Sequence, residues 1–184
     1  MGGAQNALIF LVDAILTLYA LVILLRFLLQ VVRADFYNPL SQFVVRATNP
    51  VLKPLRRIIP GVGGVDVAAL VLLYLFALLT VTILLLIAGI ALNPATIAIA
   101  ALVKCVTWVI NLYFFTIIIQ VILSWVSQGG YHPVAGALMA INAPLLRPFR
   151  RAIPPMGGFD LSPLFVLLLL QAANILLQGT GLVI

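Results

Sequence analysis

Four long apolar runs constrain the fold of this chain more than any other feature. They extend over Ala7 to Val32, Val67 to Leu92, Ile97 to Val126 and Leu161 to Leu177. A helix needs about 20 apolar residues to cross the hydrocarbon core of a bilayer. The runs are continuous rather than alternating, which favours helices over barrel strands. Since 65% of the residues are hydrophobic and only 8% are charged, the chain could not cover a water-facing surface. We predict an all-α polytopic membrane protein with four transmembrane helices.

The basic residues gather in two loops, at positions 33–66 and 127–160. These loops hold eight of the ten Lys and Arg residues, and the termini and the turn at Asn93-Pro94 hold none. By the positive-inside rule, both loops are predicted to be cytoplasmic, with both termini and the central turn on the outer side. No basic region precedes the first run, so we expect that run to be a transmembrane helix rather than a cleaved signal.

The chain is an internal duplication. When it is shifted by 94 positions without a gap, Arg56-Arg57 falls on Arg150-Arg151 and Asp66 falls on Asp160. From position 50 to 66, ten of seventeen positions are identical. We predict two repeats, 1–92 and 93–184, each with two transmembrane helices in the same orientation. A pseudo-two-fold axis along the membrane normal should relate them.

The repeated loop reads Pro-x-x-x-Pro-x-Arg-Arg-x-Ile-Pro-x-x-Gly-Gly-x-Asp. This motif, its duplication and its place between paired apolar runs resemble the YggT family of bacterial membrane proteins, which has plastid relatives. The resemblance covers nearly the whole chain and implies a bacterial inner membrane. It also implies a connection to osmotic or ion homeostasis, to cell division and envelope organisation, or to plastid cytochrome or nucleoid assembly. No single molecular activity unites that family.

Each loop has the pattern of an amphipathic interfacial segment. Asn38-Pro39 and His132-Pro133 look like a helix cap followed by Pro at the first helical position. Apolar residues then recur at helical spacing beside cations, which suits a helix lying among lipid headgroups. Pro50 and Pro54 are expected to break the segment, so we predict a kinked amphipathic hairpin.

Two kinds of charged residue in the loops are candidate site residues. The cations could set topology only, or they could bind anionic headgroups or an acidic partner; they are Lys53, Arg56, Arg57, Arg147, Arg150 and Arg151. Asp66 and Asp160 follow the Gly-Gly turns and can cap the next helix, where the helix dipole favours an anion. They could also pair with the upstream arginines, or form a proton or cation site.

Three charged residues lie inside the apolar runs, where each is a functional hypothesis by default. Asp13 and Lys104 lie about two turns inside the outer ends of the first and third runs, so they could pair and join the repeats. Arg26 could snorkel to the cytoplasmic interface, and its counterpart in the second repeat is Gln120. The alternative reading of these charges is a conduction pathway.

Nothing in the sequence predicts an enzyme, a cofactor or a metal. His132 is the only histidine and Cys105 the only cysteine, and no metal-ligand or nucleophile motif is present. Without an aromatic-interleaved basic patch, nucleic acid is not an expected partner. We expect an accessory or assembly protein that contacts lipids and a membrane-protein partner through its basic loops. A small transporter or channel for ions such as potassium is the alternative, and homo-oligomerisation is left open.

Overall fold

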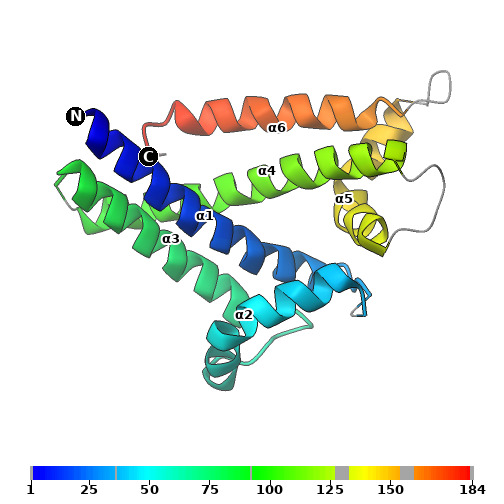
Figure 1. The fold of residues 1–184 in the computed structure, drawn as a ribbon, viewed down its shortest axis with the longest axis horizontal. Coiled ribbons are helices and arrows are strands. Elements are labelled where there is room, and N and C mark those ends of the chain that lie inside the picture. Colours follow the sequence, from blue (N-terminus) through cyan, green and yellow to red (C-terminus); the bar gives the residue numbers. More distant parts are fainter. Residues whose placement is uncertain (1, 36, 92, 127–132, 154–159, 183–184) are drawn as a thin grey trace.

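The computed structural model describes residues 2–35, 37–91, 93–126, 133–153 and 160–182. This part of the chain is all-α and contains six helices. They are α1 (Gly3–Val31), α2 (Pro39–Ile58), α3 (Val67–Ala88), α4 (Pro94–Val126), α5 (Pro133–Ala152) and α6 (Ser162–Gln178). The all-α prediction is confirmed (Figure 1).

Three of these helices are long and apolar enough to cross a membrane. They are α1, α3 and α4, with 29, 22 and 33 residues. The fourth predicted span, α6, is apolar but has 17 residues, which is shorter than the roughly 20 residues of a full crossing. Large apolar side chains are exposed along these helices, among them Phe10, Ile15, Leu168 and Leu176. Such exposure fits a lipid environment, where these side chains remain out of water.

The predicted duplication is visible in the helices themselves. Helices α2 and α5 each have 20 residues, and their first and last residues lie 94 positions apart. Within each repeat, the amphipathic helix packs against both apolar helices: α2 contacts α1 and α3, and α5 contacts α4 and α6. The buried core lies where α1, α3 and α4 meet, around Ile23, Ala77 and Trp108.

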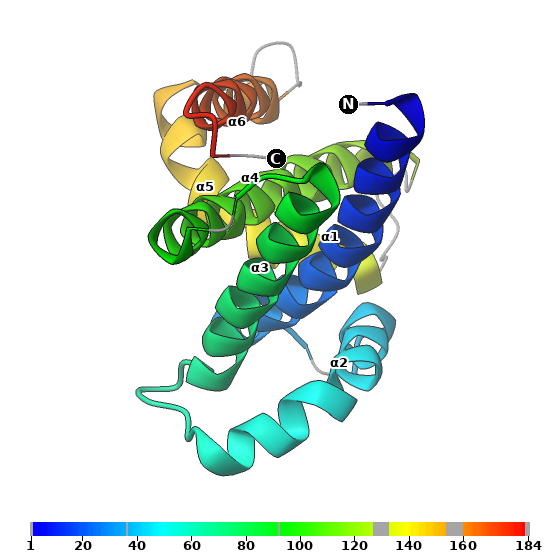
Figure 2. The same ribbon diagram turned by 90° about the vertical axis from the view of Figure 1, so that its left-hand side faces the viewer.

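The packing between repeats is less symmetric than a two-fold axis requires. Helix α3 packs against α4, and a two-fold axis would map this contact onto one between α6 and α1. In the described part of the chain α1 and α6 make no such contact. Figures 1 and 2 show α6 lying beside α4 and apart from α3. The two repeats therefore share the same internal packing, but the contacts between them follow the predicted pseudo-two-fold axis only in part.

The prediction that prolines break the loop into a hairpin is wrong. Pro50 and Pro54 lie inside one continuous helix, as do Pro144 and Pro148 in α5. A proline inside a helix removes one backbone hydrogen bond and pushes away the carbonyl four residues earlier, which kinks a helix without necessarily ending it. Figure 2 shows α2 changing direction along its length. The loop therefore forms a single bent amphipathic helix.

Candidate functional site

An arginine and an aspartate ten residues apart form an ion pair in each repeat. In the first repeat, Arg56 donates two hydrogen bonds to Asp66, one of them from Nε at 3.1 Å. In the second repeat, the Nε of Arg150 lies 2.8 Å from Oδ2 of Asp160. We call each ion pair a clasp, because it ties the end of an amphipathic helix to the start of the next apolar helix.

Each aspartate also serves the helix that follows it. Asp66 is the N-cap of α3 and accepts a hydrogen bond from the backbone N–H of Ala69 at 3.2 Å. Asp160 lies one residue before the cap position and accepts from the N–H of Ser162 at 2.9 Å. Burial alone would raise the pKa of Asp160, but hydrogen bonds from Ser162 and Arg150 hold that pKa below its usual value. The two roles predicted for the aspartates, capping and pairing, are thus combined.

The turn before the first clasp requires glycine. Gly63 and Gly64 have φ angles of 60° and 82°, in the left-handed region that side chains disfavour. Val62 and Val65 flank them and exchange two backbone hydrogen bonds, of 3.1 and 3.0 Å, which closes the turn and directs Asp66 back toward α2. The corresponding glycines at 157 and 158, and the cap predicted at His132, lie outside the described residues.

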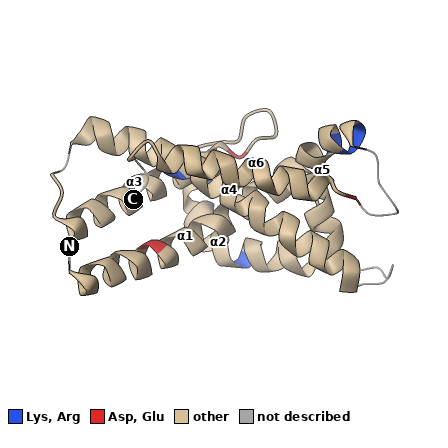
Figure 3. Cartoon of the chain, turned by 90° about the horizontal axis from the view of Figure 1, so that it is seen from above, with Lys and Arg blue, Asp and Glu red and all other residues tan. Residues whose placement is uncertain are grey.

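The other predicted loop cations point away from the protein. Lys53, Arg57, Arg147 and Arg151 are all exposed on α2 and α5. The arginine pairs 56–57 and 150–151 occupy the last turns of their helices, where cations interact favourably with the helix dipole. In each pair the first arginine forms the clasp and the second stays exposed. Charged residues are few elsewhere, and Figure 3 shows them separated by long uncharged stretches of helix.

The intramembrane pair predicted between the repeats is present. Lys104 Nζ lies 2.7 Å from Asp13 Oδ1, and the lysine side chain is only 6% exposed. One turn further along both helices, the indole N–H of Trp108 donates to the hydroxyl of Thr17 at 3.1 Å. Since these contacts join α1 to α4, they fix the two repeats to each other with polar groups that lipid cannot solvate.

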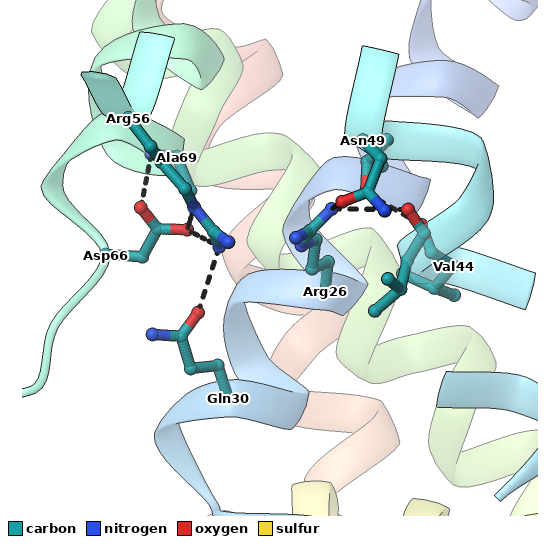
Figure 4. Close-up of polar contacts among 9 residues, drawn as sticks. Arg26, Gln30, Val44, Asn49, Arg56, Asp66 and Ala69 are labelled. Atoms are coloured by element: carbon teal, nitrogen blue, oxygen red, sulfur yellow. Dashed lines mark hydrogen bonds and ion pairs between the residues drawn. The ribbon is translucent and has the colours of Figure 1, made fainter. Parts of the chain in front are cut away.

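Arg26 is held within the protein by residues of α2. Its side chain is buried, and Nη1 donates to Thr48 Oγ1 at 2.6 Å and to Asn49 Oδ1 at 3.0 Å. The reason is that α2 folds back against α1 and supplies these acceptors within the protein. Figure 4 shows Arg26 pointing from α1 toward Asn49 of α2.

The second repeat has a neutral version of the same cluster. Asn142, in the position equivalent to Thr48, donates to Gln120 Oε1 at 2.8 Å, and Gln120 is the counterpart of Arg26. The hydroxyl of Thr116 donates to Asn142 Oδ1, also at 2.8 Å. Both Thr48 and Asn142 are fully buried. Each repeat therefore fixes its amphipathic helix to its first apolar helix through one buried polar residue.

A cavity of about 330 Å³ lies beside Arg26 in the first repeat. It is lined by Arg26, Leu29, Gln30, Arg33, Ala34, Ser41, Val44, Val45 and Arg56. One wall is apolar, and three guanidinium groups contribute the charge.

Arg33 has an unusual backbone at the edge of this cavity. Its φ of 51° makes it the one non-glycine residue with a positive φ in the described chain. Backbone hydrogen bonds from Arg33 to Gln30 and from Ala34 to Leu29, of 3.1 and 2.9 Å, close the end of α1. Glycine is the usual residue at such a position, and a side chain there costs about 1–2 kcal/mol.

Sequence reasoning missed the polar residues that hold α2 and α5 in place. Thr48, Asn49 and Asn142 were not singled out, because a small polar residue on an amphipathic helix is usually solvated. One signal was available. Arg26 and Gln120 occupy equivalent positions in the two repeats, and a polar side chain buried at that position requires a hydrogen-bond partner within its own repeat. The described residues hold no cluster of three or more potential metal ligands.

These observations define a class: a duplicated α-helical membrane protein in which each repeat pairs two apolar helices with one bent basic helix. The model of the CCB3/YggT family matches residues 5–87 and again 99–181. The chain belongs to the CCB3/YggT family, and the predicted resemblance is confirmed.

The chain is similar in sequence to several uncharacterized proteins. An uncharacterized protein of Pseudomonas aeruginosa is 46% identical over 178 residues, which cover 96% of this chain and 90% of the relative. The uncharacterized protein YggT of Escherichia coli K12 is 41% identical over 181 residues, with 96% and 94% covered. The uncharacterized protein ycf19 of Guillardia theta is 31% identical over 74 residues, covering 40% of this chain but 81% of that protein. No solved structure matches the chain.

Proposed function

We propose that this chain is a non-enzymatic accessory or assembly protein of the bacterial inner membrane, acting in envelope organisation or the osmotic stress response. Its four apolar helices all lie within the bilayer, with α6 as the shortest, and both basic helices lie on the cytoplasmic face. There the exposed cations contact anionic headgroups and a membrane-protein partner with an acidic segment.

The proposal rests on the different positions of the two arginines in each pair: the first forms an ion pair and, among the described residues, the second does not. Arg56 and Arg150 each pair with an aspartate, Arg150 while remaining 45% exposed, whereas Arg57 and Arg151 are exposed beside them and take no part in a clasp. The clasps fix the orientation of α2 and α5, so the exposed cations are presented on rigid supports rather than on loose loops. Preorganised charges favour recognition because less entropy is lost on binding.

The intramembrane charges give less support to the alternative of an ion transporter or channel. A cation pathway needs acidic groups that can bind and release ions along the route. Asp13, the one acidic residue in the described apolar helices, is paired with Lys104 at 2.7 Å. We therefore assign this pair to holding the repeats together.

Photo-crosslinking from matched positions tests the accessory function. A photo-reactive residue is placed at position 53 or at position 147, which are equivalent under the repeat, and at Leu168 as a lipid-facing control. We expect a discrete protein adduct from one or both basic helices and none from Leu168. The adduct should disappear when Arg57 and Arg151 are replaced by glutamine, while the clasps remain intact.

Flux measurements separate the two functions. Purified protein in liposomes under a potassium gradient should conduct no more than empty vesicles. Flux that is abolished by Lys104→Gln, together with the absence of a charge-dependent adduct, would overturn the accessory function in favour of transport.

A further inference from the structure

The cavity beside Arg26 has the dimensions and charge of a ligand site. Its volume of about 330 Å³ falls within the range of roughly 300–1,000 Å³ that is usual for small-molecule sites. Arg26, Arg33 and Arg56 line it, and its lining includes no carboxylate among the described residues. Asp66 does not line the cavity, but its ion pair with Arg56 offsets one of these three charges. The cavity therefore has an excess of positive charge.

Donor groups around the cavity remain available for a ligand. Arg26 uses Nη1 for its hydrogen bonds to α2, and its Nε and Nη2 donate to no residue that the structure describes. Arg56 uses Nε and Nη2 toward Asp66 and Gln30, which leaves Nη1. In Figure 4 the guanidinium ends of Arg26 and Arg56 face each other across the space between α1 and α2. Like charges held face to face in a partly buried space are stabilised by an anion between them.

The geometry of Arg33 is an independent sign of function. A glycine would fit the end of α1 without strain, yet an arginine occupies this position with a φ of 51°. The turn that ends α1 sets this φ, but it does not account for an arginine in place of glycine, and residues held in such backbone regions are concentrated at functional sites. The side chain of Arg33 makes no ion pair with any residue in the described chain, and it lines the cavity.

We propose that this cavity binds a phosphate group, with Arg26 at its floor and Arg33 and Arg56 at its rim. Guanidinium groups recognise phosphate oxygens through paired, charge-assisted hydrogen bonds. The apolar wall, which includes Leu29 and Val44, suits the glycerol and first acyl carbons of a lipid. The phosphate is carried by a lipid headgroup or by a small soluble phosphate, and the same three cations hold either.

The site belongs to the first repeat. The positions equivalent to Arg26 and Arg33 are Gln120 and Ser127 in the second, so two of the three cations are missing there. Its residues also differ from the four cations assigned to the accessory function, which are Lys53, Arg57, Arg147 and Arg151, so either proposal can fail without the other.

Binding to the purified, delipidated chain in detergent tests the site. The probes are dioleoyl phosphatidate, dioleoyl phosphatidylcholine, glycerol phosphate and inorganic phosphate, with bound lipid counted by native mass spectrometry and soluble phosphates measured by calorimetry. We expect one tightly bound equivalent of phosphatidate or of a soluble phosphate, and at least tenfold weaker binding of phosphatidylcholine. Binding of phosphatidate alone identifies a lipid, and binding of the soluble compounds identifies a small phosphate.

Two variants that each remove one cation, but with different expected effects on binding, keep the test decisive. Arg33→Gly removes a cation and relieves the strained backbone, so the protein should be at least as stable as wild type while phosphate binding weakens tenfold or more. Arg46→Gln removes the same charge from an exposed position on α2 that does not line the cavity, and it should change binding less than twofold. Equal weakening by both variants, or no stoichiometric binding by the wild type, would overturn the proposal.

Discussion

The ion pair between Asp13 and Lys104 makes a quantitative prediction. Replacing Lys104 with methionine leaves the Asp13 carboxylate in the apolar region with one neighbouring donor, the hydroxyl of Thr17 at 3.4 Å. Replacing Asp13 with leucine leaves an ammonium group that is 6% exposed. A charge at the centre of a transmembrane helix costs about 2.5–3.5 kcal/mol. These residues lie nearer the helix ends, so each single replacement should destabilise the fold by about 2 kcal/mol.

The double replacement Asp13→Leu with Lys104→Met should behave differently. Apolar residues of similar volume can replace a buried ion pair at little cost, so the double variant should lie within about 1 kcal/mol of wild type. The coupling free energy between the two sites would then be about 3 kcal/mol.

The free energy of unfolding can be measured through the thiol of Cys105. It is the sole cysteine of the chain, adjoins Lys104 and is half-buried, with Sγ 3.8 Å from the carbonyl of Leu73 on α3. Pulse labelling of its thiol along a denaturant titration reports the free energy of unfolding without any added probe. Additive effects of the two single replacements would refute the idea that these residues stabilise the fold as a pair.

Three further predictions follow from the described geometry. Gly64→Ala places a side chain at a φ of 82° and should destabilise by about 1–2 kcal/mol, measured by the same labelling. Asn142→Leu removes the donor to the Gln120 amide oxygen on α4 and should cost about 1–3 kcal/mol, seen as faster proteolysis of α5. Because the folded-state pKa of Asp160 is lowered, its stabilising contribution is complete above the ordinary carboxyl value of 3.8 and is lost as the pH falls through the folded value. The slope of stability against pH in that acidic range should therefore shrink in Asp160→Asn, and an unchanged slope would contradict the clasp in the second repeat.

The general architecture was accessible from the sequence because its signals are long or repeated. Apolar runs and a 94-residue offset average over many positions, so single exceptions do not obscure them. The pairing of Asp13 with Lys104 was also predictable, since two opposite charges at equal depth in lipid have few other partners. The caps at Asn38 and Asp66 follow from local chemistry that needs no tertiary information.

The errors arose where tertiary contacts decide the outcome. The sequence shows that Pro50 removes a hydrogen bond, but not that packing of α2 against α1 and α3 keeps the helix continuous. For Arg26 the sequence suggests snorkelling toward the interface, but it does not show which groups the side chain would meet. Its actual acceptors, Thr48 and Asn49, become visible only when the bent helix is placed. The cavity requires the same placement, so no sequence pattern could have found it.

The contact between α3 and α4, which has no equivalent between α6 and α1, bears on how two copies can diverge. Two separate single-repeat chains could associate with equal interfaces, and any substitution would then appear on both sides at once. The short connection through Asn93 and Pro94 instead places each copy in a fixed and distinct neighbourhood. A mutation in one half no longer has to suit the other half. Covalent joining therefore permits one half to keep a charged recess while the other fills the same location with uncharged hydrogen-bonding side chains.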